Sequence, residues 1–526
     1  MSADLVLTGG NVVTMAPQGG HPARALAVER GRIVAIGSED EILSLVDDHT
    51  RVVELGGRTV LPGFVDTHVH LVQTGLGLAG PDLAGCRSVE QVLEHVRAGL
   101  DGHPAGRPAF YHRCVLASLD RPLTRRDLDR LAPSTPLGVG DIELNRCVVN
   151  SAALDVLEIA PETRGLDRSG SGGEPTGLVA EEAHVQARAF FYDALDDAAR
   201  LDCARRACEL ALRAGVTTVH AIEGREAFGC RDLPVLAESR QALPLRLVLY
   251  SQSADLSRAA IPGVKGIGDL WADGAYVDRS AALVEPYADD PATCGHLNYR
   301  AQDLERLVFR ANALGLQVSF HAIGDAAIEQ VLDAYERVQQ GSPDLSARCP
   351  RIEHFSLASE AQIERAVRLG VGVAMQPAMS AGPQETVARR LGPERARRRH
   401  AYRTIVDAGL LVAGGSDSDV TPICPLAGIH AVVNQSEESR RLSLPEALAL
   451  FTVNGARLAS EEAVKGTLEP GKLADMVVLE RDPFSVPLDE IGAIPVAMTL
   501  VGGQVRWARP GFGAGTAQES GGTYAH

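Results

Sequence analysis

Residues Leu61 to His70 read LPGFVDTHVH, and this segment gives the first indication of both fold and chemistry. The apolar run from Val60 to Val65 predicts a buried strand that leads into a His-x-His pair. Successive side chains of a strand alternate between its two faces, so His68 and His70 are expected to point the same way. Two imidazoles on one face make half of a ligand set for a first-row metal ion.

Three later fragments supply further donors of the kind that metal ions bind. Each is an apolar run typical of a strand, and each ends in a ligand-type side chain: His321, His354 and Asp417. In a (β/α)8 barrel the carboxyl ends of all the strands meet at one mouth. The sequence therefore predicts one metal site made by five side chains: His68, His70, His321, His354 and Asp417.

The middle of the chain alternates strands and helices, as a parallel barrel requires. Amphipathic helices are predicted over residues 199–214, 303–314 and 360–369, each ended by a glycine and followed by a strand. More than eight segments qualify as strands, so the second and fourth barrel strands are left unassigned. The predicted fold class is α/β, a (β/α)8 TIM-like barrel.

Both ends of the chain differ in pattern from the middle, because they predict short strands and turns without alternating helices. A hairpin is predicted across Arg30-Gly31. We expect residues 1–60 and 465–510 to form one small β-sandwich beside a barrel over residues 61–464. Residues from about 72 to 180 are rich in Gly and Pro and predict an insertion after the first barrel strand, and the Gly/Ala/Ser-rich residues 511–526 predict a disordered tail.

Composition narrows the classes of function. The 526 residues carry a formal net charge of -17, which argues against a nucleic-acid-binding surface. No apolar run is long enough for a membrane span, and the first twenty residues lack the pattern of a signal peptide. The nine cysteines form no Cys-x-x-Cys pair, which predicts free thiols and a cytoplasmic location.

The motifs together resemble the amidohydrolase superfamily of metal-dependent hydrolases. Within it the chain is most similar to amidohydrolase family 3, the YtcJ-like group that includes N-substituted formamide deformylases. The shared segments, besides Leu61 to Leu71, are 272–274, 279–283, 285–287, 321–325, 351–354, 414–417 and 468–475. This resemblance implies a small-molecule substrate, hydrolysis of an amide or N-formyl C–N bond, and often a homodimer.

The resemblance also implies roles for individual residues. Asp417 would be both ligand and general base, and His354 would help to stabilise the oxyanion. A heterocycle deaminase would use the same ligands, and a metal-free binding protein is a third alternative. Asn145, Glu181 and Asp273 fall in segments near the substrate, although relatives often carry a histidine near Asn145.

One departure concerns the number of metal ions. Many relatives place a lysine four residues before the Asp-Gly of the segment that matches Asp273-Gly274, and here that position is Asp269. Without the lysine, we favour a single Zn²⁺, although two ions bridged by Asp269 are an alternative. Fe²⁺ or Mn²⁺ in place of Zn²⁺ is also left open. Asp269 and His220 are thus interpreted either as further metal ligands or as residues that hydrogen-bond the ligands. For His220 the alternative is a histidine that is simply buried in the core.

Overall fold

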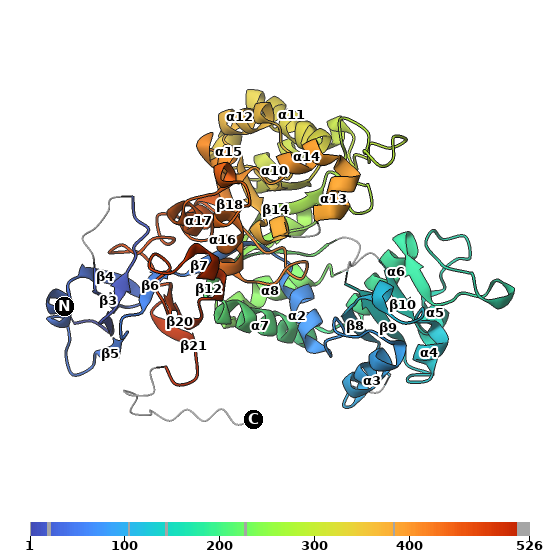
Figure 1. Cartoon of the computed structure of the whole chain (residues 1–526), viewed down its shortest axis with the longest axis horizontal. Coiled ribbons are helices and arrows are strands. Elements are labelled where there is room, and N and C mark those ends of the chain that lie inside the picture. The colour runs from blue at the N-terminus through green and yellow to red at the C-terminus, as the bar shows by residue number, and fades with distance from the viewer. Residues whose placement is uncertain are drawn as a thin grey trace.

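The computed structural model describes residues 2–17, 23–103, 106–142, 146–225, 229–381 and 384–512. A barrel with its helices occupies the middle of the molecule, and two smaller lobes flank it (Figure 1). One lobe, on the left in Figure 1, contains strands from both ends of the chain, and the other, on the right, contains the inserted segment. The two lobes therefore lie on opposite sides of the barrel.

Eight parallel strands form the barrel sheet, and each pairs with the next one along the chain. They are β7 (Phe64–Val69), β12 (Val216–Glu223), β13 (Arg246–Ser251), β14 (Val264–Trp271), β15 (Gln317–Ala322), β16 (Arg351–His354), β17 (Gly372–Met375) and β18 (Leu411–Gly414). The predicted TIM-like barrel is confirmed. The second and fourth strands, which the sequence left unassigned, are β12 and β14.

The first and last strands meet along a short seam that nearly closes the barrel. Val69 forms a parallel bridge with Ser418, and the backbone N–H of Asp417 donates to the His68 carbonyl at 2.8 Å. Gly415 allows this close approach, because a Cβ there would lie 2.8 Å from the His68 nitrogen. The seam therefore brings Asp417 against His68.

The continuous strand predicted from Val60 to Val65 is wrong, because the chain changes sheets at Gly63. Strand β6 (Thr59–Pro62) pairs antiparallel with β19 (Met476–Leu479) in the terminal lobe, and β7 starts the barrel at Phe64. The backbone stays extended, but its hydrogen-bond partners change: Gly63 N donates to Asp475 and Phe64 N donates to Gly215. Hydrophobicity alone does not reveal such a change of partner.

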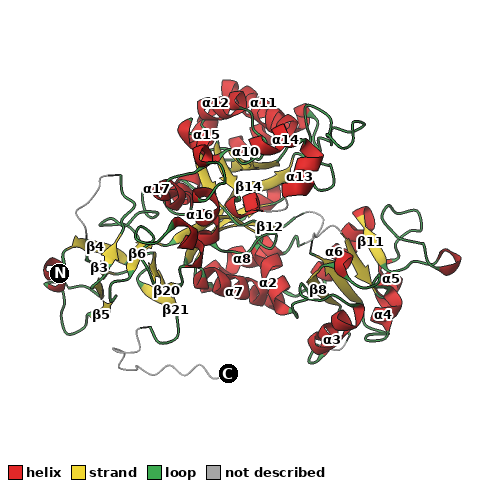
Figure 2. Cartoon of the chain, in the orientation of Figure 1, coloured by secondary structure: helices red, strands yellow, loops and turns green. Residues whose placement is uncertain are grey.

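Helices cover the outside of the barrel (Figure 2). They are α2 (Leu71–Ala79), α7 (Asp197–Arg213), α8 (Asp232–Ser239), α9 (Leu256–Ala259), α10 (Ala301–Ala313), α11 (Asp325–Gly341), α12 (Glu360–Leu369), α13 (Gln384–Leu391), α14 (Pro393–Arg398), α15 (Tyr402–Asp407), α16 (Pro425–Val433), α17 (Leu444–Leu450) and α18 (Val453–Leu458). The three predicted helices are confirmed as α7, α10 and α12. Among the described residues, no helix has the length and apolar character needed to cross a bilayer.

The terminal lobe contains two sheets that share an apolar core. The first has the order β4-β3-β1-β5 and the second β2-β6-β19-β20-β21. Their further members are β1 (Leu5–Thr8), β2 (Asn11–Val12), β3 (Ala25–Glu29), β4 (Arg32–Gly37), β5 (Arg51–Glu54), β20 (Val496–Val501) and β21 (Gln504–Ala508), with α1 (Glu39–Leu43) packed against the first sheet. Strands β3 and β4 form the predicted hairpin, with positive φ at Arg30 and Gly31.

The inserted lobe has its own four-stranded sheet, in the order β11-β10-β9-β8. Its elements are α3 (Val89–Leu100), β8 (Ala109–Cys114), α4 (Arg125–Asp129), β9 (Leu137–Asp141), β10 (Arg146–Val149), α5 (Ser151–Leu157), β11 (Leu178–Ala180) and α6 (Glu181–Asp193). The insertion leaves the barrel after α2 and returns at α7. These two helices lie side by side (Figure 1), so both connections are close together.

Candidate metal centre

Six ligand-type side chains converge at the carboxyl ends of the barrel strands. Five are the predicted ligands, and the sixth is Asp269 of β14: His68, His70, Asp269, His321, His354 and Asp417. All except His70 are buried, and His70 is only partly exposed. Burying four imidazoles and two carboxylates together is costly unless they are paired or bind a common partner, so the set suits a cation.

One carboxylate oxygen of Asp417 faces the His-x-His pair. Asp417 Oδ1 lies 3.3 Å from His68 Nε2 and 3.4 Å from His70 Nε2. Two donor atoms that are each roughly 2.0–2.1 Å from a tetrahedral Zn²⁺ would be about 3.3 Å apart. These three atoms therefore have the spacing of ligands around one ion.

Asp269 lies between two pairs of histidines. Its Oδ2 is 3.9 Å from His68 Nε2 and 4.0 Å from His70 Nε2. Its Oδ1 is 3.6 Å from His321 Nδ1 and 3.7 Å from His354 Nε2. Each oxygen of this carboxylate thus faces a different pair, which is the arrangement expected of a bridging ligand.

The histidine tautomers can be deduced from their outer partners. His68 Nδ1 donates to Glu353 (2.9 Å), His70 Nδ1 to the Ile222 carbonyl (2.9 Å), His321 Nε2 to the Gly274 carbonyl (3.2 Å) and His354 Nδ1 to Gln376 (2.7 Å). Because these oxygens only accept, each of those ring nitrogens carries the hydrogen. The other nitrogen of each ring is therefore a lone-pair donor toward the centre, as in neutral metal-bound histidine.

Two central atoms support the fit to a metal ion. His68 Nε2 and Asp269 Oδ1 are buried, and neither has a hydrogen-bond partner among the described residues. A buried polar atom without a partner costs free energy, typically about 1–3 kcal/mol. Coordination would satisfy both atoms at once, so the donor set fits a divalent ion with nitrogen and oxygen ligands.

Three of the six converging residues have a left-handed backbone. The φ angles are +51° at Asp269, +69° at His354 and +55° at Asp417. Such conformations are uncommon outside glycine and cost on the order of 1–3 kcal/mol each. Each turns a side chain toward the centre at the end of a strand, so the strain is concentrated at the site.

The charges of the centre shift the pKa values in opposite directions. Burial would raise the pKa of Asp417 and of Asp269, but the surrounding histidines hold both below the ordinary value of a carboxyl group. Burial would lower the pKa of His70 and of His354, but Asp417 and Asp269 raise both to about 9. In the absence of a metal ion the two residue types therefore stabilise each other's charged forms, and a bound metal ion would take the place of the central proton on His70 and on His354.

A buried ion pair supports the centre from inside the barrel. Glu353 accepts from His68 at 2.9 Å, from Arg351 at 2.8 Å and also from the Ser319 hydroxyl. His220 is in this layer, because its Nδ1 lies 3.1 Å from Arg351 Nη1. His220 therefore neighbours the residues that hold His68 and is not one of the six converging side chains.

The three residues predicted near the substrate have different positions. Asp273 is buried and accepts the backbone N–H groups of Ala282, Ile323 and Gly324, an arrangement that holds two loops together. Glu181 forms an exposed ion pair with Arg164 at 2.6 Å, at the start of α6 in the inserted lobe. Asp273 Oδ1 also lies 3.7 Å from His321 Nε2, so Asp273 neighbours the six-residue cluster, whereas Glu181 is not part of it, and Asn145 lies outside the described residues.

Sequence reasoning missed several residues that contact the ligands. Glu353 and Gln376 orient His68 and His354, and Gln252 donates to Asp269 Oδ2 at 2.6 Å. Glu223 accepts the backbone N–H groups that begin α2. Polar residues at or just beyond the ends of apolar barrel strands are a usable signal for such residues, and all four occupy that position.

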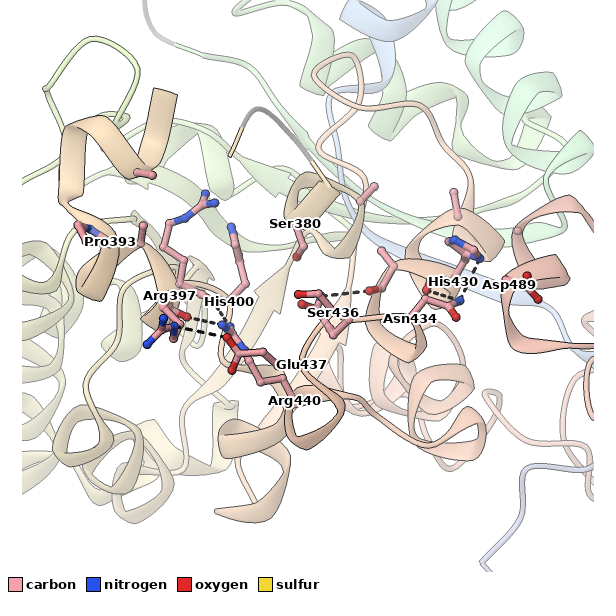
Figure 3. A pocket seen from close by; sticks show the side chains of 18 of the residues that line it. Ser380, Pro393, Arg397, His400, His430, Asn434, Ser436, Glu437, Arg440 and Asp489 are labelled. Carbon is pink, nitrogen blue, oxygen red and sulfur yellow. Dashed lines mark hydrogen bonds and ion pairs between the residues drawn. The ribbon is translucent and has the colours of Figure 1, made fainter. Parts of the chain in front are cut away.

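A cavity of about 840 Å³ lies away from this cluster (Figure 3). Its walls come from α14, α16 and the segment around Asp489, and Arg397, His400 and Arg440 are among its labelled residues. None of the six central residues lines it. Its charged groups also have partners within the protein, since Arg397 pairs with Glu437 and Arg440 donates to the Arg399 carbonyl. The reacting group of a substrate is therefore not placed there.

Comparison with known proteins agrees with this centre. Residues 51–506 match the family described as Amidohydrolase family. The protein YtcJ of Bacillus subtilis, an amidohydrolase by name, is 32% identical over 415 residues, which cover 73% of this chain and 76% of that protein. An N-substituted formamide deformylase of Arthrobacter pascens is 28% identical over 552 residues, covering 97% and 99%.

A solved structure has the same architecture. The crystal structure of an uncharacterized metal-dependent hydrolase from Pyrococcus furiosus superposes with a TM-score of 0.79 at 28% identity. The match covers 91% of this chain and 100% of that one. The similarity therefore includes the two lobes as well as the barrel.

Proposed function

Because the chain belongs to the amidohydrolase family and has a histidine–aspartate metal site, we propose that it hydrolyses a non-peptide C–N bond of an amide or N-formyl type. The observation that carries the proposal is the approach of Asp417 to His68 and His70, at 3.3 and 3.4 Å. The similarity to an N-substituted formamide deformylase over nearly the full length of both chains supports the N-formyl alternative.

Two ion positions are proposed, in place of the single zinc that the sequence favoured. His68, His70 and Asp417 would hold one ion, His321 and His354 the other, and Asp269 would contribute to both. Nitrogen-rich ligation suits Zn²⁺, with Fe²⁺ or Mn²⁺ as alternatives. When bound, such ions lower the pKa of water and polarise a substrate carbonyl.

Asp417 is proposed as the general base and then as the general acid. Its carboxylate takes a proton from the attacking water while the new C–O bond forms at the substrate carbonyl. It then gives that proton to the leaving nitrogen as the C–N bond breaks, so a carboxylate and an amine are released. The lowered pKa of Asp417 keeps it ionised for the first step. His354 would lie beside the developing oxyanion.

The test combines metal content with product analysis. Protein purified without added metal is measured by elemental mass spectrometry, and about two ions per chain are expected. A panel of N-formyl amines and simple amides is then tested for formate or carboxylate release. Release of ammonia from a ring substrate, with no amine product, would assign a deaminase instead.

The variant Asp417→Asn separates catalysis from folding. Loss of general base catalysis typically costs about 10²- to 10⁴-fold in rate, and a loss of this size in kcat is expected. The exposed Asp407→Asn is the matched control, since Asp407 pairs with Arg403 at the surface. Full activity in an Asp417→Asn protein that folds and keeps its metal would exclude the proposed mechanism.

A further inference from the structure

Two neighbouring N–H groups donate to one oxygen of the Asp269 carboxylate. Gln252, directly after β13, donates from its Nε2 to Asp269 Oδ2 at 2.6 Å, and Trp271 Nε1 donates to the same oxygen at 3.4 Å. The other oxygen, Oδ1, is buried and has no hydrogen-bond partner among the described residues. The two oxygens of this carboxylate are therefore in unequal surroundings.

The orientation of the Gln252 amide follows from its partners. Its Nε2 also lies 3.2 Å from the Asp269 carbonyl, so it faces two oxygens that can only accept, and only the NH₂ group of an amide can donate to them. The backbone N–H of Gln252 donates to the Glu223 carbonyl at 2.7 Å. Gln252 and Asp269 are both buried. Gln252 is therefore fixed between the end of β12 and Asp269.

The hydrogen bond from Gln252 sets the rotation of the Asp269 carboxylate. The last torsion of an aspartate side chain has broad preferences, so the side chain alone does not decide where its two oxygens point. A donor that holds one oxygen therefore also directs the other one. With Oδ2 held by Gln252, Oδ1 lies 3.6 Å from His321 Nδ1 and 3.7 Å from His354 Nε2.

The two pairs of histidines consequently have different carboxylates closest to them. Asp269 Oδ2 is 3.9 and 4.0 Å from the Nε2 atoms of the His-x-His pair, whereas Asp417 Oδ1 is 3.3 and 3.4 Å from the same two atoms. The charge of Asp269 Oδ2 is also shared with two N–H donors. Asp417 is therefore the nearer carboxylate for the His-x-His pair, and Asp269 Oδ1 faces His321 and His354.

We propose that Gln252 is a positioning residue, which makes Asp269 mainly a ligand of the ion position formed by His321 and His354. The position at the His-x-His pair then depends mainly on Asp417. This inference rests on the two ion positions of the proposed function and adds that each depends on its own carboxylate. Removal of the Gln252 amide should therefore weaken one ion position and spare the other.

The experiment measures the affinity for each ion in the full-length, zinc-loaded protein. The protein is equilibrated with a series of free Zn²⁺ concentrations set by a chelator, and bound zinc per chain is measured by elemental mass spectrometry. Gln252→Met keeps the length of the side chain but removes its N–H donor. It should weaken the binding of one of the two ions by about 10- to 100-fold, as is typical for loss of an outer partner of a ligand, and leave the other nearly unchanged.

A double-mutant cycle with His321→Asn assigns the weakened ion. His321→Asn should remove the ion position of His321 and His354, so the ion that is retained lies at the His-x-His pair. Adding Gln252→Met to this variant should leave the affinity for the retained ion unchanged. A merely structural role of Gln252 would instead weaken the binding of both ions, including the retained one.

Two further variants separate this role from folding. Trp271→Phe removes the weaker donor at a position that is 41% exposed, and it should weaken the same ion by a smaller factor. Gln317→Met is the matched control, because Gln317 is a buried amide that donates to the carbonyls of Cys349 and Leu458 at the start of β15, away from the strand ends that carry the ligands. It should leave the binding of both ions unchanged.

Several results would overturn the proposal. They are unchanged binding of both ions in Gln252→Met, equal weakening of both, or weakening of the retained ion in the His321→Asn background. If Gln252→Met did not fold, unchanged zinc binding in Trp271→Phe would overturn it as well. A single ion in the wild-type protein would reject the two ion positions together with this role. Release of formate from N-formyl amines by such a protein would still support the proposed hydrolysis, so the two failures are distinguishable.

Discussion

Glu353 accepts the Nδ1 hydrogen of His68 at 2.9 Å and at the same time pairs with Arg351 at 2.8 Å. One buried carboxylate thus fixes both the tautomer of a metal ligand and the position of a buried cation. Burial would raise the pKa of Glu353, but Arg351 and His68 bring it below its ordinary value, so the group is charged. The negative charge of Glu353 therefore interacts both with His68 of the candidate metal centre and with Arg351 inside the barrel.

Glu353→Gln should weaken both functions of this carboxylate. Loss of an outer partner of a ligand typically lowers metal affinity about 10- to 100-fold, and a decrease of this size is expected in competition titrations with a metallochromic chelator. Arg351 would also lose its counter-charge, which typically costs about 3–5 kcal/mol of stability for a buried pair. The exposed Glu360→Gln is the control, and unchanged metal affinity in Glu353→Gln would refute this role.

Asp269→Asn should reduce the amount of bound metal by half or more, because an amide is a poor bridging ligand. Metal per chain is measured by elemental mass spectrometry. The exposed Asp202→Asn on α7 is the control and should retain the metal, because Asp202 pairs with Arg206 at the surface. Equal metal content in both variants would show that Asp269 is no ligand.

Removal of the metal should destabilise the whole barrel. An ion that binds only the folded state stabilises it by about 2.7 kcal/mol at a hundredfold excess over its dissociation constant. Treatment with a chelator should therefore lower the thermal midpoint, and Zn²⁺ or Mn²⁺ should restore it. Mg²⁺ should not, since it prefers all-oxygen octahedral sites. A midpoint that does not respond to a chelator that has removed the metal would contradict this prediction.

Gly75→Ala should be destabilising, although alanine usually favours helices. A Cβ at Gly75 would lie 1.8 Å from the Cys203 carbonyl of α7, so α2 would have to move away. Overpacking of this kind typically costs about 1–3 kcal/mol. Gly77→Ala on the same helix meets no atom within 4 Å and should stabilise by about 0.5–1 kcal/mol. Chemical denaturation of both variants checks the difference in sign.

Stability should fall below neutral pH because His112 is buried in its neutral form. Burial, followed by the charges of Arg188 and His184, lowers the pKa of His112 from 6.5 to about 3. The unfolded chain therefore takes up a proton that the folded chain does not, so this contribution is complete above about pH 6.5 and is lost as the pH falls. The expected slope is about 1.4 kcal/mol per pH unit for this group.

Denaturant unfolding at a series of pH values from 7.5 to 5 would check this slope. His112→Asn should reduce it, whereas the exposed His95→Asn should leave it unchanged. An identical slope in the wild-type protein and in His112→Asn would mean that His112 is protonated in the folded state.

The sequence was sufficient to predict the barrel and the convergence of His68, His70, His321, His354 and Asp417, because strand patterns are local and a parallel barrel necessarily collects its strand ends at one mouth. Other features depended on backbone geometry that no pattern specifies. Glu353 and His354 are adjacent, so a regular strand would place them on opposite faces. The left-handed backbone at His354 lets both contact the centre.

The positions of residues in the folded chain explain the other differences between the sequence prediction and the structure. The sequence left open whether Asp269 bridges two ions, and in the folded chain its left-handed backbone places its carboxylate between two histidine pairs. Gly63, where the chain passes from one sheet to another, is marked by no change in hydrophobicity.

The side-by-side packing of α2 and α7 has an evolutionary consequence. The insertion starts and ends on this helix pair, so its sequence and length can change while the ends of the barrel segments stay in place. A gene encoding another inserted lobe could replace this one without displacing any of the six central side chains. Exchange of the inserted lobe alone would let descendant proteins act on new substrates while the six central side chains stay unchanged.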